Sequence, residues 1–80
     1  MKDILNNFLK EFGKKVKSER ESKNLTLQDM EFHTGIDFSD FNKIEQGKTN
    51  ITFRTFLKIA KGLGKHPKEL MDFKVDLGEE

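Results

Sequence analysis

The residues from 26 to 47 constrain the fold most strongly, because start and stop signals for two short helices follow one another there. Thr26 and Asp37 are helix-capping residue types, and each is followed three positions later by an aspartate that can complete a reciprocal cap. Gly35 and Gly47 end the two segments, because glycine readily adopts the left-handed conformation that follows many helices. The aspartates that complete the caps are Asp29 and Asp40.

Apolar residues within this stretch are spaced so that they face inward from both helices. They are Met30, Ile36, Phe41 and Ile44. Two short helices joined by a turn that opens on glycine form a helix-turn-helix arrangement, whose second helix can enter a DNA major groove.

Three further helices are predicted around this motif. Residues 1–23 form one long helix or two abutting ones, because apolar residues recur at spacings of three and four and Gly13 interrupts the pattern. Thr52 caps a fourth helix that runs to about Leu63, and Pro67 suits the first position of a short fifth helix. The apolar side of the fourth helix is predicted to be Phe53, Phe56, Leu57, Ile59, Ala60 and Leu63.

The C-terminal tail has a different pattern, in which apolar and charged residues alternate as in an extended strand. A lone strand needs a partner edge, and the chain contains no other strand signal. Either the tail is disordered beyond Phe73 or it pairs with a second copy of the chain. In the second case the candidate homodimer interface is Met71, Phe73, Val75 and Leu77.

Composition excludes several classes of protein. Eighty residues make one domain, and the lack of cysteine excludes disulfides and thiolate metal sites. No apolar run approaches the roughly 20 residues of a membrane span, and the start of the chain lacks the features of a signal peptide. We therefore expect a cytoplasmic protein that does not contact a membrane.

The net charge of +1 conceals a segregation of charge along the chain. Residues 26–42 carry four acidic groups and no Lys or Arg, whereas residues 43–68 carry seven basic groups and one acidic group. A basic cluster is what a phosphate-binding surface requires. The acidic block within the motif argues against such a surface there.

Catalysis is not expected, because no catalytic or metal-binding motif occurs. The two histidines, His33 and His66, are far apart in the sequence, and His66 most simply caps the helix that Pro67 begins. The sequence predicts no cofactor and no metal.

Residues 12–73 resemble the Xre/Cro family of helix-turn-helix regulators, which includes phage repressors and the controller proteins of restriction–modification systems. The motifs that carry the resemblance are Gly35-Ile36, Ile44-Glu45-Gln46-Gly47 and the segment from Leu57 to Gly64. The resemblance implies an all-α, compact five-helix lambda-repressor-like domain that binds operators as a dimer. Residues 1–11 would then be an N-terminal helical extension, and residues 74–80 a C-terminal tail.

The resemblance also implies a partly buried ion pair between Arg20 and Glu45. Three positions depart from the family pattern: Leu27 replaces the usual glutamine, Glu31 the usual small residue, and Ile51 the frequent proline. Glu31 either widens the crossing of the two motif helices or turns outward.

By the family's geometry, the outward side of the second motif helix reads bases and the surrounding rim binds phosphates. Asp37 is expected to act as a cap, with Asp40 as its reciprocal partner. The predicted base-reading residues are Phe38, Ser39, Asn42 and Lys43. The predicted phosphate-binding residues are Thr26, Gln28, Lys48, Thr49, Asn50, Thr52 and Arg54.

Two functions remain open at this stage. The first is a sequence-specific, dimeric DNA-binding regulator that acts on double-stranded DNA. The second is a helix-turn-helix fold that serves as a protein-interaction module, a reading favoured by Leu27, Glu31 and the acidic block. Phe32 and Phe38 are expected to be exposed, unless Phe32 folds back on the first helix.

Overall fold

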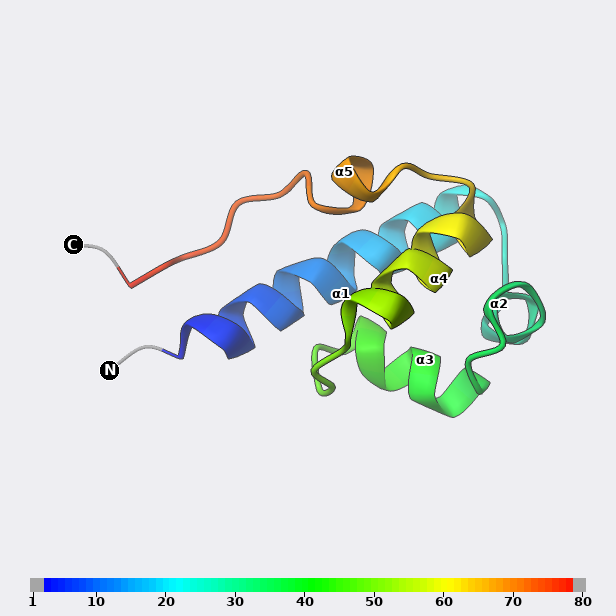
Figure 1. Ribbon diagram of the computed structural model, residues 1–80, viewed down its shortest axis with the longest axis horizontal. Helices are drawn as coiled ribbons and strands as arrows, with labels where there is room; N and C mark the ends of the chain where they lie inside the picture. Colours follow the sequence, from blue (N-terminus) through cyan, green and yellow to red (C-terminus); the bar gives the residue numbers. More distant parts are fainter. Residues whose placement is uncertain (1–2, 79–80) are drawn as a thin grey trace.

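The longest element is one continuous helix, α1 (Ile4–Ser22), against which the rest of the chain packs (Figure 1). The computed structural model describes residues 3–78, so residues 1–2 of the predicted first helix and 79–80 of the predicted tail lie outside the described residues. The other elements are α2 (Leu27–Thr34), α3 (Phe38–Glu45), α4 (Phe53–Leu63) and α5 (Pro67–Leu70). The predicted all-α order of five helices is confirmed.

Gly13 does not break α1, which corrects one of the two alternatives drawn from the sequence. A Cβ atom at this position would lie 2.4 Å from the carbonyl oxygen of Glu45 and 2.6 Å from that of Ile44. The glycine is therefore needed for the close approach of the C-terminal end of α3 to α1.

The helix starts are formed by side-chain caps. Thr26 Oγ1 accepts the Asp29 N–H at 3.0 Å, and Asp29 Oδ2 accepts the Thr26 N–H at 2.8 Å, as the sequence predicts. At α3, Asp37 Oδ2 accepts the Ser39 N–H at 3.0 Å. The prediction of Asp40 as reciprocal partner is wrong, because the structure shows a one-way cap at Asp37.

The core lies among the five helices, with α3 packed against α1 and α2, and α4 packed against α2 and α5. Phe12 of α1 packs against Phe56 of α4, with ring centroids 5.7 Å apart. Leu27, which replaces a polar residue of the family pattern, is half-buried against this core. The largest fully buried side chains are Phe12, Phe41, Met30, Ile59, Leu63, Leu70 and Val16.

Helix α4 has apolar residues on more than its buried side. Phe53 is 80% exposed and Leu57 is 54% exposed, so these two members of the predicted apolar side lie outside the core. The two residues are one turn apart and form an outward apolar stripe. The core contacts only one side of α4, and Phe53 and Leu57 lie outside that side.

The tail forms no strand within the described residues, although its two-residue period is typical of one. Residues 74–78 instead run as irregular extended chain back along the N-terminal half of α1 (Figure 1). Asn7 Nδ2 donates to the Asp76 carbonyl at 3.4 Å, and the Phe73 ring lies 5.3 Å from that of Phe8. The tail therefore pairs with its own chain through side chains.

Across residues 3–78, the search for a membrane-spanning segment found no helix with both the length and the apolar character required.

Candidate nucleic-acid interface

Helix α3 has one buried side and one exposed side. Phe41, Ile44 and Glu45 are buried, and Asn42 is half-buried at the boundary between the sides. The exposed side carries three of the four predicted base-reading residues, namely Phe38, Ser39 and Lys43. The predicted set thus lies on one surface of one helix.

The C-terminal end of α3 is attached to α1 by an ion pair. Arg20 Nε and Glu45 Oε2 are 2.7 Å apart, and a second bond joins Arg20 to Glu45 Oε1 at 3.0 Å. The side chains are 11% and 2% exposed, and Arg20 also donates to the Leu25 carbonyl at 2.7 Å. The hydrogen bond to Glu45 raises the pKa of Arg20 above its ordinary value. The pair sets where α3 lies relative to α1.

The N-terminal end of α3 is attached to α2 by a contact that the sequence did not reveal. Glu31 turns outward, and its Oε1 accepts the Phe38 N–H at 3.1 Å. Helix N-termini have unpaired N–H groups and favour negative charge, so a carboxylate is well suited to this position. No sequence pattern indicates that Glu31 pairs with the Phe38 N–H, because the contact crosses the turn between the two helices.

The loop after α3 lies beside the exposed side of that helix. The Lys48 N–H donates to the Lys43 carbonyl at 2.9 Å, which places two lysines at the same end of α3. Thr49, Asn50 and Thr52 line a shallow recess together with residues of α3, α4 and the turn before α3. Asp40 of α3 also lines the recess, so a carboxylate lies among these polar residues.

The remaining predicted phosphate-binding residues lie outside this recess. Thr26 and Gln28 are exposed at the start of α2, and Arg54 is exposed in the first turn of α4. The Thr26 and Thr52 hydroxyls accept the backbone N–H groups of Asp29 and Thr55, at 3.0 and 3.1 Å. Each oxygen caps its helix, and the Thr52 hydroxyl also donates to Thr55 Oγ1 at 3.3 Å.

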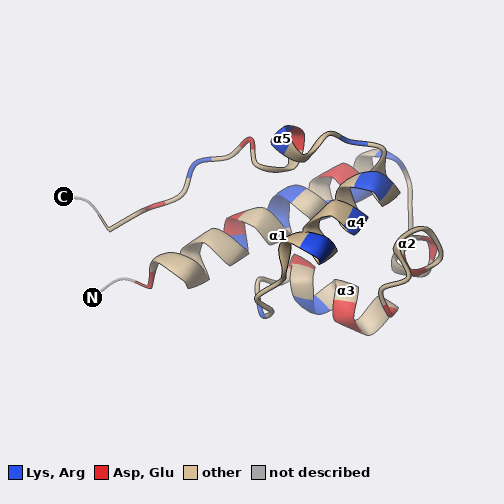
Figure 2. Ribbon diagram, viewed as in Figure 1, with Lys and Arg blue, Asp and Glu red and all other residues tan. Residues whose placement is uncertain are grey.

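Charge is distributed unevenly along the motif (Figure 2). Acidic residues lie toward the turn between α2 and α3, and basic ones toward the far end of α3 and on α4. Hydrogen bonds from Thr26 hold the pKa of Asp29 below its ordinary value, and those from Ser39 do the same for Asp37. Both carboxylates therefore remain charged at neutral pH as caps.

Comparison with known proteins shows the family to which this fold belongs. A model described as a helix-turn-helix domain matches residues 13–74, which is most of the chain. The control protein C.BamHI of Bacillus amyloliquefaciens is 36% identical over 71 residues, covering 88% of each protein. The chain belongs to the Xre-type helix-turn-helix family.

Solved structures of other helix-turn-helix proteins have the same fold. The restriction-modification controller protein C.AhdI from Aeromonas hydrophila superposes with a TM-score of 0.76 at 32% identity, over 78% of this chain and 94% of that one. An HTH_3 family transcriptional regulator from Vibrio cholerae gives a TM-score of 0.80 at 27% identity, over 84% of this chain and 38% of that one.

Proposed function

We propose that this helix-turn-helix protein is a sequence-specific DNA-binding regulator that binds its operator as a dimer through α3. The observation that carries the proposal is the attachment of α3 at both ends. Arg20 and Glu45 hold one end, and Glu31 and the Phe38 N–H hold the other. A helix held in this way presents its exposed side chains in one orientation, which direct reading of base edges requires.

The exposed side of α3 has chemistry that suits base edges. Asn42 is suited to a bidentate bond with adenine, and Phe38 to contact with a thymine methyl group. Lys43 reaches guanine or a phosphate, and the Ser39 hydroxyl, which donates to Asp37, can still accept a hydrogen bond.

The rim supplies contacts to the DNA backbone. Lys48, next to Lys43, and Arg54, in the first turn of α4, provide charge. The helix starts at Thr26 and Thr52 provide N-terminal dipoles, with Gln28, Thr49 and Asn50 nearby in sequence. These contacts position the protein without reading sequence.

The named relatives indicate the kind of regulation. C.BamHI is a control protein and C.AhdI a restriction-modification controller protein. We infer a regulator of the same kind, which acts in the cytoplasm by occupying its operator and catalyses no reaction.

The test is a selection from random double-stranded oligonucleotides, followed by binding measurements at several salt concentrations. The expected result is an enriched palindrome with half-sites about 34 Å apart or a multiple of that. Affinity for any duplex should fall with salt, with a slope near −0.9 for each phosphate neutralised. No enrichment, and no binding at about 50 mM salt with micromolar protein, would overturn the proposal.

One observation favours a protein-interaction module instead. Phe32 on α2 is 86% exposed and does not fold back on α1, and it follows the acidic Glu31 in the sequence. Two results together would favour this second function. The DNA selection would enrich no sequence, and a Phe32→Ala variant would no longer bind a protein partner that the wild type binds.

A further inference from the structure

Thr34, the last residue of α2, is a polar residue buried at the point where the chain leaves that helix. Its hydroxyl makes two hydrogen bonds, one in each direction along the chain. It donates to the Met30 carbonyl at 2.6 Å, and it accepts the Ile36 N–H at 3.0 Å. Because Thr34 is buried, any part that it plays in recognition must be exerted through its neighbours.

The bond from Ile36 to Thr34 lies inside the turn between the two motif helices. Gly35 has a positive φ angle of 77°, and Ile36 packs against the core one residue later. Asp37, the N-cap of α3, follows directly. A half-buried N–H that loses its acceptor pays the cost of desolvation without a partner. The Thr34 hydroxyl therefore stabilises the one path by which the chain enters α3.

Two side chains of α2 hold this turn from different sides. Glu31, which is exposed, accepts the Phe38 N–H, and Thr34, which is buried, accepts the Ile36 N–H. Water can take the place of an acceptor at an exposed helix N-terminus, but it has poor access to a half-buried N–H. Of the two contacts, the one made by Thr34 is therefore the one that solvent cannot replace.

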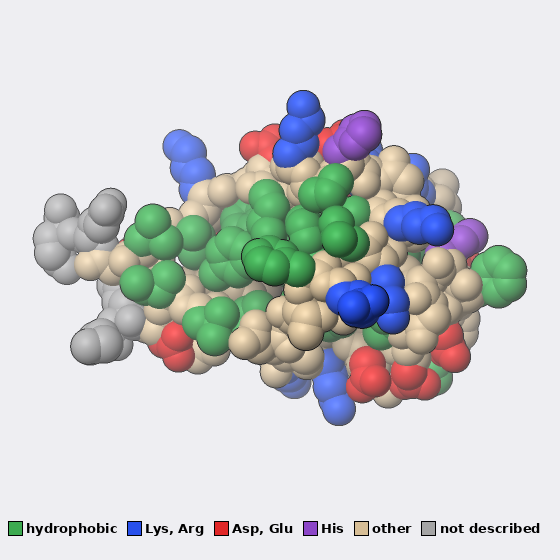
Figure 3. Space-filling view, viewed as in Figure 1, with side chains coloured by type: hydrophobic (Ala, Val, Ile, Leu, Met, Phe, Trp, Pro, Cys, Tyr) green, Lys and Arg blue, Asp and Glu red, His purple; other side chains and the backbone are tan. Residues whose placement is uncertain are grey.

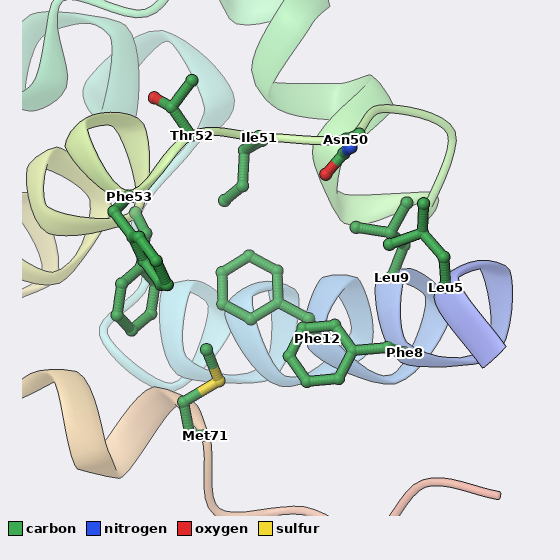
Figure 4. Close-up of a pocket in the computed structure, with 10 residues that line it drawn as sticks. Leu5, Phe8, Leu9, Phe12, Asn50, Ile51, Thr52, Phe53 and Met71 are labelled. Atoms are coloured by element: carbon green, nitrogen blue, oxygen red, sulfur yellow. The ribbon is translucent and has the colours of Figure 1, made fainter. Parts of the chain in front are cut away.

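Helix α4 has different neighbours at its two ends. At its start, Phe53 lines an apolar hollow together with Phe12 of α1 (Figure 4), and hydrophobic side chains gather over α1 and α4 on this face (Figure 3). Toward its other end, α4 packs against α2. A Cβ atom at Gly62 would lie 2.6 Å from Thr34 Cγ2. Glycine is a poor helix former, and here it leaves the space that the Thr34 methyl group occupies.

We propose that Thr34, seated against Gly62, is a positioning residue that sets how α3 leaves the turn and thereby how well α3 discriminates between base sequences. Side chains read base edges only when they are held in a precise geometry. Contacts to phosphates carry no sequence information. A loosened turn should therefore lower sequence preference more than it lowers affinity for random duplex DNA. The inference rests on the proposed function, because the quantity it concerns is operator preference.

Matched hydroxyl variants test the proposal. Thr34→Val keeps the branched shape without the hydroxyl, and Thr34→Ser keeps the hydroxyl. The measured quantity is the ratio of affinity for the selected operator to affinity for random duplex, from which the folded fraction cancels. Thr34→Val should lower this ratio about tenfold, as one poorly read base pair does, and Thr34→Ser should stay within about twofold of the wild type. An unchanged ratio in Thr34→Val, or an equal fall in Thr34→Ser, would overturn the proposal.

Ser22 offers the control, because its hydroxyl donates to the Glu19 carbonyl at 2.8 Å near the end of α1, away from the motif. Ser22→Ala should leave the ratio unchanged. A fall as large as that in Thr34→Val would show that loss of any such hydroxyl lowers sequence preference, and would overturn the role of Thr34.

A second pair of variants moves Thr34 without removing its hydroxyl, and carries the test if Thr34→Val does not fold. Gly62→Ala places a methyl group 2.6 Å from Thr34 Cγ2, so the end of α2 must shift and the ratio should fall. Adding Thr34→Ser removes Cγ2 and should restore most of the ratio. An unchanged ratio in Gly62→Ala, or no recovery in the double variant, would overturn the seating of Thr34 against α4.

Amide hydrogen exchange tests the contact without DNA. The Ile36 N–H should exchange about 5- to 100-fold faster in Thr34→Val than in the wild type, the factor that corresponds to one lost hydrogen bond, and no faster in Thr34→Ser. Unchanged exchange at Ile36 in Thr34→Val would overturn the proposal. The two proposals fail separately: a wild type that binds no duplex contradicts the regulator, and the exchange rates still decide whether Thr34 holds the turn.

Discussion

Glu31 of α2 accepts a hydrogen bond from the backbone N–H of Phe38, the first residue of α3, at 3.1 Å. The carboxylate occupies the place where a helix N-terminus would otherwise meet a phosphate. It therefore stabilises α3 and, if α3 binds DNA, repels the phosphates that approach this end. These two effects have opposite consequences for stability and for binding.

We predict that Glu31→Gln binds all duplexes about two- to fivefold more tightly, the equivalent of about 0.4–1 kcal/mol, while lowering the free energy of unfolding by less than about 1 kcal/mol. Glutamine keeps the acceptor and removes the charge. Fluorescence anisotropy and urea unfolding measure the two quantities. Asp72→Asn, which removes an exposed charge after α5, should leave both unchanged. Weaker binding by Glu31→Gln would contradict the repulsive role.

The Arg20–Glu45 pair should dominate the polar contribution to stability. Arg20→Ala leaves Glu45, whose side chain is 2% exposed, without its partner, and we expect a loss of about 3–5 kcal/mol. The double variant Arg20→Met, Glu45→Leu should recover much of this loss, because no buried charge remains. Urea unfolding measures both. A loss below about 1 kcal/mol for Arg20→Ala would show that the pair is solvated.

Gly13→Ala should destabilise the protein although alanine is the better helix former by about 1 kcal/mol. The added Cβ would lie 2.4 Å from the Glu45 carbonyl oxygen, so α3 would have to move away from α1. We expect a net loss of about 1–3 kcal/mol in thermal or urea unfolding. Ser18→Ala, at an exposed position of the same helix, is the control and should be neutral or stabilising.

Asn42 and Lys48 should affect binding in different ways. Asn42→Ala is expected to cost about 1–3 kcal/mol on the selected operator and to relax the preference at one base pair. Lys48→Ala should weaken binding to all sequences alike and reduce the salt slope by about 1. Competition assays with operators altered at single positions distinguish these outcomes. If Asn42→Ala weakened binding to all sequences equally, Asn42 would contact the DNA backbone and not a base.

The cap at Asp29 should make part of the stability depend on pH. Its pKa is lowered in the folded chain by hydrogen bonds from Thr26, so its contribution is present above the unfolded value of about 3.9 and is lost as the pH falls through the lower folded value. The stability difference between the wild type and Asp29→Ala should be constant from pH 6 to 5 and shrink below about pH 4. A difference that stays constant to pH 2 would exclude the charged cap.

Much of the local structure followed from the sequence, because caps, stops and helical spacing depend on residues within a turn of one another. Thr26 with Asp29, the positive φ angles of 77° at Gly35 and 74° at Gly47, and Pro67 at the start of α5 are of this kind. The resemblance to the family added the pairing of Arg20 with Glu45, which no local pattern contains. The outward side of α3 also came from the family's geometry.

Tertiary structure alone decided which elements meet. Gly13 interrupts the helical pattern in the sequence, but in the fold it is where α3 contacts α1. Glu31 accepts a hydrogen bond from the Phe38 N–H on the other side of the turn. Phe53 and Leu57 match the apolar residues of the core in type but lie outside it, because the core covers only one side of α4. The alternation of the tail favoured a strand, but residues 74–78 form none, and the Phe73 ring packs against Phe8 of α1. In each case the deciding free energy comes from residues distant in sequence, which a local pattern does not contain.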